Sequence, residues 1–165
     1  MDTQTLAAAP RTAGPSRTVH RWASRAAWAA AAWAVLFSAV HLYWLLGGRV
    51  GLPAGLSVRD NLPLLVIDIL AVPLCAAAAV PALATVRPWG RRLPGRLTTV
   101  GLWATTALLL LHAAPSVPDW AALAVGARTT ADLDPMNRFA TLLYEPFFMT
   151  GGLLFALTTL GRRRS

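Results

Sequence analysis

LPLLVIDILAVPLCAAAAVPALATV, residues Leu62–Val86, is almost wholly apolar, and Asp68 is the only charged side chain in it. A run of this length exceeds the ~20 residues that a helix needs to cross the hydrocarbon core of a bilayer. Lipid offers no hydrogen-bond partner to bare peptide groups, so a segment buried in it must be helical. The segment therefore predicts a transmembrane helix.

Three further runs of similar length and character occur along the chain: Ala26–Leu46, Leu97–Val117 and Phe139–Leu160. The whole sequence is 56% hydrophobic and only 13% charged, with a mean hydropathy of +0.52. That composition is too apolar for an ordinary soluble domain. The sequence therefore predicts an all-α fold, a four-helix transmembrane bundle.

All basic residues are arginine, and the formal net charge is +8. Four arginines precede the first run, four lie between the second and third runs, and three end the chain, whereas the other two loops hold only Arg49, Arg59, Arg128 and Arg138. By the positive-inside rule, both termini are expected in the cytoplasm, with the chain crossing the cell membrane several times. The charge is then explained by topology and by contact with the lipid bilayer, and no nucleic acid partner is expected.

The predicted organisation has three parts. Residues 1–21 read as a mobile, Arg-containing tail because they show no apolar period. Residues 22–161 form the four-span membrane domain, and residues 162–165 form a basic C-terminal tail. The single cysteine, Cys75, excludes an internal disulfide and a C-x-x-C redox pair, and the absence of lysine excludes Schiff-base chemistry.

Each predicted span carries one titratable His, Asp or Glu side chain: His41, Asp68, His112 and Glu145. With the topology above, all four fall in the outer third of the membrane, and a rise of 1.5 Å per residue puts Asp68 and Glu145 roughly 9 Å below its outer boundary. Charged groups at such depth cost roughly 2.5–3.5 kcal/mol each, so they should face the bundle interior and pair there. Glu145, in the sequence YEPFF, is the only glutamate of the chain.

Aromatic side chains accompany these polar groups at helical spacing. The spacing predicts one stripe on the first span, formed by Trp33, Phe37, His41 and Trp44, and a face on the last span that carries Glu145 and Phe148. We therefore expect a polar spot in an aromatic-lined cavity that binds a hydrophobic small-molecule substrate. The candidate catalytic residues are Glu145, Asp68 and His41, and the candidate substrate-binding residues are Trp33, Phe37, Trp44, Tyr144, Phe148 and His112.

Structural explanations for the same residues stay open. Asp68 and His41 are also consistent with a buried ion pair that holds two helices together, and His112 with a side chain that simply meets water at the interface. Two histidines are too few to support a haem site, so no cofactor is expected. Pro146 has no N–H to donate, so we expect it to free the carbonyl of Leu142, one turn earlier, for a ligand or water.

The expected chemistry follows from the cavity. Burial favours the neutral form of a carboxyl group, so Glu145 or Asp68 is expected to hold its proton at neutral pH. A protonated carboxyl can donate to an alkene or an epoxide, π faces stabilise the resulting cation, and a second base takes the final proton back. These requirements are those of proton-initiated cyclisation of a prenyl chain. No metal is expected, because no Asp-rich diphosphate motif lies in a span.

Two segments carry a family resemblance: HLYWLLGGRVGLP, which starts at His41, and YEPFFMTGG, which starts at Tyr144. They resemble marker segments of a family of small four-span actinobacterial membrane proteins, mostly of unassigned function, and the likeness covers Trp28 to Leu160. In size and span number the chain is also similar to bacterial membrane-bound terpene cyclases that close the sesquiterpenyl chain of indole natural products. That likeness implies that Glu145 and Asp68 are the acidic residues and that the tryptophan stripe shapes the cavity.

The sequence-based hypothesis is therefore a membrane-bound terpene cyclase that acts on a prenylated small molecule, such as a sesquiterpenyl indole. The alternative is a non-catalytic small membrane protein or a proton-coupled carrier component, in which Glu145 or Asp68 acts as a protonation switch. Four spans are few for a carrier, so this alternative requires a homodimer, for which Gly151 and Gly152 would allow close helix contact.

Overall fold

The computed structural model describes residues 17–163, with the side chains of residues 21–162. The described chain is helical and contains no strand. Four of its segments are long and apolar enough to cross a membrane: Arg21–Leu45, Leu62–Ala84, Gly95–Ala124 and Pro135–Arg162. The predicted all-α class and the four predicted spans are confirmed, and the chain is a multi-pass membrane protein.

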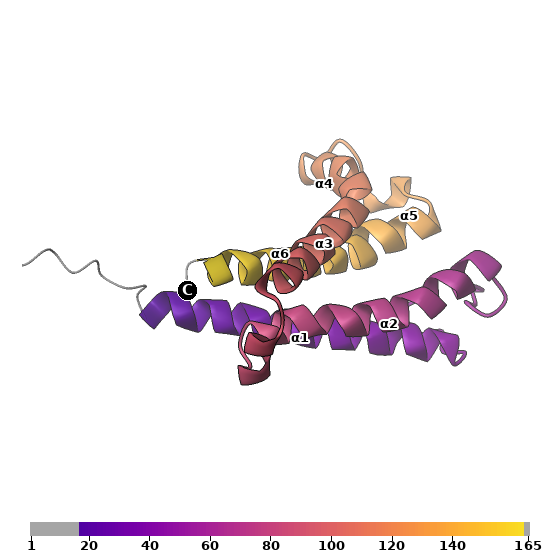
Figure 1. The fold of residues 1–165 in the computed structure, drawn as a ribbon. Helices are drawn as coiled ribbons and strands as arrows, with labels where there is room; N and C mark the ends of the chain where they lie inside the picture. The colour runs from indigo at the N-terminus through magenta and orange to yellow at the C-terminus, as the bar shows by residue number, and fades with distance from the viewer. Residues whose placement is uncertain (1–16, 164–165) are drawn as a thin grey trace, which may run out of the picture.

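The long helices are α1, α2, α3 and α6, and short helices fill the turns between them (Figure 1). In chain order the elements are α1 (Arg17–Leu45), α2 (Leu62–Ala84), η1 (Pro88–Arg92), α3 (Gly95–Ala113), η2 (Ala114–Ser116), α4 (Val117–Ala124), η3 (Thr130–Asp132), α5 (Pro135–Phe139), η4 (Ala140–Tyr144) and α6 (Glu145–Arg163). Because α1 begins at Arg17, the helix starts inside the segment that was expected to be a tail. Residues 1–16 and 164–165 lie outside the described chain.

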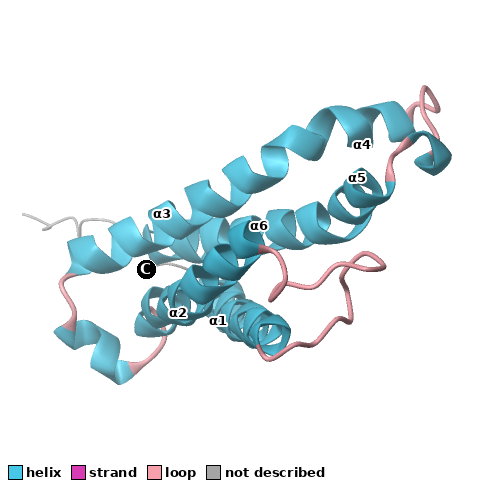
Figure 2. Cartoon of the chain, turned by 90° about the vertical axis from the view of Figure 1, so that its right-hand side faces the viewer, coloured by secondary structure: helices cyan, strands magenta, loops and turns pink. Residues whose placement is uncertain are grey.

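The four long helices form a ring in which each one contacts its neighbours in the order α1, α2, α3, α6. They alternate in direction, so the start of α1 and the end of α6 lie at the same end of the bundle (Figure 1). The opposite end carries α4, α5 and the loop between α1 and α2, which are drawn away from the chain termini in both views (Figure 2). The arrangement places His41, Asp68, His112 and Glu145 toward this second end.

The centre of the bundle is built from small and aromatic side chains. Ala27, Ala30 and Ala34 on α1 are fully buried, as are Leu102 on α3 and Phe155 on α6. Alanine has no bulk beyond Cβ, so it lets neighbouring helices approach closely, which is how membrane helices gain van der Waals contact. The outward-facing positions are instead large and apolar, as a lipid-facing surface requires; in water they would form an extensive exposed apolar patch.

Gly151 and Gly152 serve packing inside the chain rather than contact with a second copy. A Cβ on Gly151 would lie 2.5 Å from Cζ2 of Trp33 on α1, and one on Gly152 would lie 2.5 Å from Cδ2 of Leu110 on α3. Both glycines are therefore already used to seat α6 against its neighbours. The sequence-based suggestion that they allow close contact in a dimer is wrong, because their open faces are covered within one chain.

Candidate functional site

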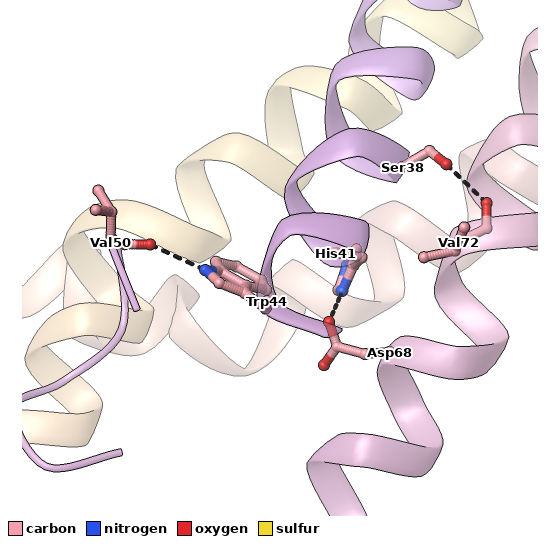
Figure 3. A network of polar contacts seen from close by, with 6 residues as sticks. All are labelled: Ser38, His41, Trp44, Val50, Asp68 and Val72. Carbon is pink, nitrogen blue, oxygen red and sulfur yellow. Dashed lines mark hydrogen bonds and ion pairs between the residues drawn. The ribbon is translucent and has the colours of Figure 1, made fainter. Parts of the chain in front are cut away.

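The first polar pair of the site joins α1 to α2. His41 Nδ1 lies 2.6 Å from Asp68 Oδ1, and both side chains are buried (Figure 3). One helical turn earlier on α1, Ser38 Oγ donates a hydrogen bond of 2.8 Å to the carbonyl oxygen of Val72 (Figure 3). These two links fasten α1 to α2 at successive turns. The expectation that Asp68 and His41 turn inward and pair is confirmed.

The second polar pair joins α3 to α6. His112 Nε2 lies 3.8 Å from Glu145 Oε1. The two partners differ in surroundings, since the His112 side chain is 54% exposed and that of Glu145 only 12%. His112 thus stands at the edge of the bundle, in agreement with the structural explanation that its side chain meets water at the interface. It also lies beside the buried carboxyl of Glu145. The distance exceeds that of a hydrogen bond, so the two side chains are neighbours without a direct hydrogen bond.

Glu145 is the least satisfied polar group of the site. Its second carboxyl oxygen, Oε2, is buried and has no hydrogen-bond partner in the described chain. Buried polar atoms in native structures are nearly always bonded, and an orphaned one marks either stored strain or a place for a group that arrives from outside. This unbonded oxygen, Oε2, belongs to Glu145, which the sequence analysis named as a candidate acid.

Phenylalanine rings fill the space between the two pairs. The ring centroid of Phe37 lies 4.4 Å from that of His41 and 5.1 Å from that of Phe148, and Phe148 lies 3.9 Å from His112. Within residues 21–162, no hydrogen bond or ion pair joins Glu145 to Asp68 or His41. The sequence predicted that the four titratable groups pair in the bundle interior without saying which partners meet. The structure places His112, and not Asp68 or His41, beside Glu145.

The chain leading into Glu145 is a π-helix, η4. The N–H of Glu145 donates to the carbonyl of Ala140, five residues back. At the same spacing the next donor would be Pro146, which has no N–H, so the freed carbonyl is that of Thr141. That carbonyl accepts a 2.7 Å hydrogen bond from the indole Nε1 of Trp120 on α4.

The expectation that Pro146 frees the carbonyl of Leu142 for a ligand stays a prediction. The carbonyl one residue earlier, that of Thr141, is the one that Trp120 occupies. The short helix α4 is thereby tied to the segment that presents Glu145. Single-turn π segments occur frequently at functional sites, because they re-aim one side chain without ending the helix.

The loop after α1 closes the site at the end that carries the polar pairs. Trp44 Nε1 donates a hydrogen bond of 2.9 Å to the carbonyl of Val50 (Figure 3). The hydroxyl of Tyr144, at the end of η4, donates to the carbonyl of Gly51. The rings of Trp44 and Tyr144 meet edge to face with centroids 6.1 Å apart. Both aromatic residues therefore tie the loop to the end of α1 and to η4.

An apolar cavity lies closer to the chain termini than the two polar pairs do. A cavity of about 560 Å³ opens between α2 and α3, and its lining includes Cys75, Pro81, Leu97 and Leu108. Of the nine candidate site residues only Trp33 lines it. The chamber that the sequence predicted around the acids is instead filled by phenylalanine rings, while open volume lies toward the other end of the bundle. Leu108, at one limit of the cavity, is one helical turn from His112.

Two residues of the site escaped the sequence analysis. Phe147 stacks on Trp33 with ring centroids 4.8 Å apart, and its carbonyl accepts a 3.2 Å hydrogen bond from the indole Nε1 of Trp33. It was missed because it lies two residues after Glu145, off the helical face that was considered. Trp120 was missed because it lies between the third and fourth apolar runs, outside the segments that were considered. The combination of Pro146 with an indole donor was the signal that could have found its role.

The remaining candidates lie where the stripe of the first span predicts. Trp33, Phe37, His41 and Trp44 are all buried on α1, so the stripe faces the bundle interior. Phe148 and Tyr144 are half-buried beside it. The arrangement can hold a proton on a carboxyl, surround a cationic carbon with π faces and restrict the access of water.

Comparison with known proteins gives a family but no activity. No curated protein matches the chain, and no solved structure matches it either. One family model matches residues 33–155, a segment that begins at Trp33 and includes both His–carboxylate pairs, and its description names no cyclase or other activity. Since the match covers most of the sequence, the chain belongs to the family described as "Protein of unknown function (DUF3995)".

Proposed function

We propose that this protein is a membrane-bound terpene cyclase that starts the cyclisation of a lipid-soluble prenylated small molecule by protonating it. The observation that carries the proposal is the buried, unpartnered Oε2 of Glu145 beside His112. A carboxyl with one loosely held and one unbonded oxygen is poised to donate a proton to a group that enters the site. A sesquiterpenyl indole, as an alkene or an epoxide, remains the substrate class that we propose.

The proposed step is an isomerisation and balances without an oxidant or a metal. With an alkene, the proton of Glu145 forms a new C–H bond with the π electrons, and the other carbon becomes a tertiary cation. With an epoxide, the proton goes to oxygen as the C–O bond breaks. A second double bond then attacks the cation and closes a ring. Loss of a C–H proton to the Glu145 carboxylate, directly or by way of His112, restores the acid and leaves a product of unchanged mass.

The aromatic surroundings of Glu145 support this chemistry. Phe37, Phe147, Phe148 and Trp33 form one connected set of rings, with neighbouring centroids 4.8–5.1 Å apart. A cation above such a ring is stabilised by about 0.5–2 kcal/mol, most strongly when water is excluded. Phenylalanine and tryptophan also lack a basic atom that would trap the cation early. The base for the final proton would come from the two polar pairs beside these rings, His41–Asp68 and His112–Glu145.

A lipid-soluble substrate would need access from the bilayer, and the cavity between α2 and α3 offers it. The cavity is lined almost entirely by apolar side chains, and its lining ends at Leu108 and Leu109, four and three residues before His112. Four residues of helix span about 6 Å. A prenyl chain lying there would bring its end to the neighbourhood of His112 and Glu145, with small movements of Phe148.

The proposed location is the cell membrane, with the arginine-rich chain ends in the cytoplasm. The distribution of arginine among the loops supports it. An alkaline phosphatase fused after Ser165, which is active only outside the cytoplasm, should therefore be inactive, while a fluorescent protein that matures only in the cytoplasm should be bright at the same position. The reverse pattern would contradict the proposed orientation.

The experiment that tests the activity supplies membranes containing the protein with linear and epoxidised prenyl indoles, in H₂O and in D₂O. We expect an isomer of unchanged mass in H₂O. In D₂O the alkene route should add one deuterium at carbon, because the initiating proton exchanges with solvent. Membranes without the protein serve as the control. Failure of every prenylated substrate to isomerise would contradict the proposal, and proton uptake coupled to solute movement would favour the carrier alternative.

A further inference from the structure

The end of the bundle that carries the chain termini is strongly basic. We call it the arginine-rich end, and its described arginines are Arg21, Arg25, Arg87, Arg91, Arg92, Arg96 and Arg162. The described acidic residues all belong to the opposite half: Asp60, Asp68, Asp119, Asp132, Asp134 and Glu145. Within residues 21–162, the only arginine in an ion pair is Arg128, at that opposite end. The positive charge of the arginine-rich end is therefore not offset by carboxylates of the described chain.

Two of these arginines line a hollow of their own. Arg91 and Arg92, together with Pro88 and Trp89, surround a cavity of about 500 Å³ on η1. The turn is held firmly, since a Cβ on Gly90 would lie only 1.9 Å from the carbonyl oxygen of Ala84 at the end of α2. The side chains of both arginines are exposed. The hollow is thus a fixed basic and aromatic recess rather than a pair of arginines on a free loop.

The basic recess adjoins the apolar cavity between α2 and α3. Leu93 follows Arg92 directly and lines the apolar cavity, and Leu97 lines it one turn further along α3. From Leu97 to Leu108 the cavity wall extends over about 16 Å of helix. The arginine-lined recess and the long apolar cavity are therefore lined by consecutive residues of the chain, Arg92 and Leu93. This pairing of charge and apolar length matches an anionic amphiphile.

We propose that this composite site binds an anionic glycerophospholipid from the leaflet at the arginine-rich end. Its phosphate lies on Arg91 and Arg92, and one acyl chain lies in the cavity between α2 and α3. The guanidinium fork suits phosphate oxygens, and Trp89 suits the boundary between headgroup and chain. An anionic lipid offsets the unpaired arginines, which a zwitterionic one does not.

The lipid site stands apart from the proposed enzymatic activity. It rests on the recess, the cavity and the arginines of the arginine-rich end, and Glu145 lines neither hollow. An acyl chain in the cavity would compete with a substrate that uses the same lateral access. The two proposals can nevertheless fail separately, because lipid occupancy is measured without any turnover.

Cys75 provides the measurement, since it is the only cysteine of the chain and lines the apolar cavity. The full chain is reconstituted in nanodiscs of phosphatidylcholine, with or without phosphatidylglycerol, and alkylation by N-ethylmaleimide is followed by intact mass. Two-thirds occupancy by phosphatidylglycerol should slow the alkylation about threefold. Equal rates in the two nanodiscs would overturn the proposal.

The variant Arg91→Gln/Arg92→Gln should lose this protection and react as fast in phosphatidylglycerol as in phosphatidylcholine. The matched control is Arg49→Gln/Arg138→Gln, which removes the same charge from the opposite end and should keep the protection. Both pairs are exposed, so neither is expected to disturb the fold. Protection that survives the loss of Arg91 and Arg92, or that the control loses as well, would contradict a specific headgroup site.

A second pair of variants tests the acyl chain. Ala78→Leu narrows the cavity, whereas Ala76→Leu adds the same atoms to an exposed position of α2 outside the cavity lining. In native mass spectra of detergent-purified protein, one retained phosphatidylglycerol is expected for the wild type and for Ala76→Leu, but not for Ala78→Leu. Equal retention by both variants would show that no chain lies in the cavity.

The same assay distinguishes a phospholipid from other ligands that carry phosphate. Inorganic phosphate and glycerol 3-phosphate, added to phosphatidylcholine nanodiscs, should leave the alkylation of Cys75 unchanged, because they lack a chain to cover it. Protection by either would overturn the lipid assignment in favour of a soluble phosphate. Protection by farnesyl diphosphate without any protection by phosphatidylglycerol would likewise overturn it, in favour of a prenyl diphosphate.

Discussion

Replacement of Glu145 by glutamine should lower the cyclisation rate by about 10²–10⁴-fold, the range that a positioned general acid contributes. Glutamine keeps the shape of the side chain but has no acidic proton. Its amide can still reach His112, so the contact between α3 and α6 is expected to persist. The measurement is the initial rate of isomer formation by membranes that contain equal amounts of wild-type and variant protein.

Two further variants make the result specific. Asp119→Asn removes a carboxylate that pairs with Arg128 on the surface, at 2.6 Å, and should keep the wild-type rate. His112→Gln should reduce the rate less than Glu145→Gln does, because His112 stands 3.8 Å from the carboxyl and Glu145 can itself take back the final proton. A Glu145→Gln variant that turns over at the wild-type rate while remaining folded would remove the acid from the proposal.

The second large effect is expected at the pair that joins α1 to α2. Replacement of Asp68 by alanine leaves His41 Nδ1 without the partner that lies 2.6 Å away, in a position where His41 is packed between Phe37 and Trp44. Stripping one member from a buried pair costs about 3–5 kcal/mol in soluble proteins. Interhelical hydrogen bonds in membranes contribute only about 0.6 kcal/mol on average, since separated helices find other partners.

We expect an intermediate loss for Asp68→Ala, about 2 kcal/mol in the free energy of unfolding, because the stranded imidazole stays buried yet the unfolded helices also lie in lipid. Thermal unfolding in detergent, followed by circular dichroism, measures it. The double variant His41→Phe/Asp68→Leu should recover most of the loss, since well-packed apolar side chains replace a buried pair at little cost. A double variant as unstable as the single one would contradict this account.

The same double variant separates a positioning role of the pair from a catalytic one. In the structure Asp68 pairs with His41, and His112 pairs with Glu145. We therefore expect the folded double variant to keep a substantial fraction of its turnover, reduced by less than about tenfold, well below the general-acid effect. A loss as deep as that of Glu145→Gln would return Asp68 and His41 to the catalytic machinery that the sequence suggested.

The arrangement of the spans could be predicted because it depends on local properties of the chain. Apolar runs long enough to cross a bilayer must be helical there, and the run Leu62–Val86 becomes α2 with nearly the same bounds. The helical period then placed Trp33, Phe37, His41 and Trp44 on one inward face, and all four are buried. Counting residues along each helix also predicted that His41, Asp68, His112 and Glu145 lie toward the same end of the bundle.

Which of the four polar side chains pair with each other depended on which helices are neighbours in the ring, and residue spacing along the sequence does not reveal this. Because α1 packs on α2 and α3 packs on α6, the four polar side chains divide into two pairs, and Phe37 and Phe148 lie between them. The π-turn before Glu145 was equally hidden, as was the hydrogen bond by which Trp120 holds the carbonyl of Thr141. Gly151 and Gly152 likewise gained their role only from the neighbours that cover them.

By itself the sequence determined that this is a four-span helical membrane protein with a buried acid in its last span, because hydropathy and helical period act along one segment at a time. The tertiary structure alone decided which histidine meets Glu145, where the open apolar volume lies and how the arginine recess adjoins it. These features arise between segments distant in sequence, and they depend on the order and closeness of helix packing, which no single segment encodes.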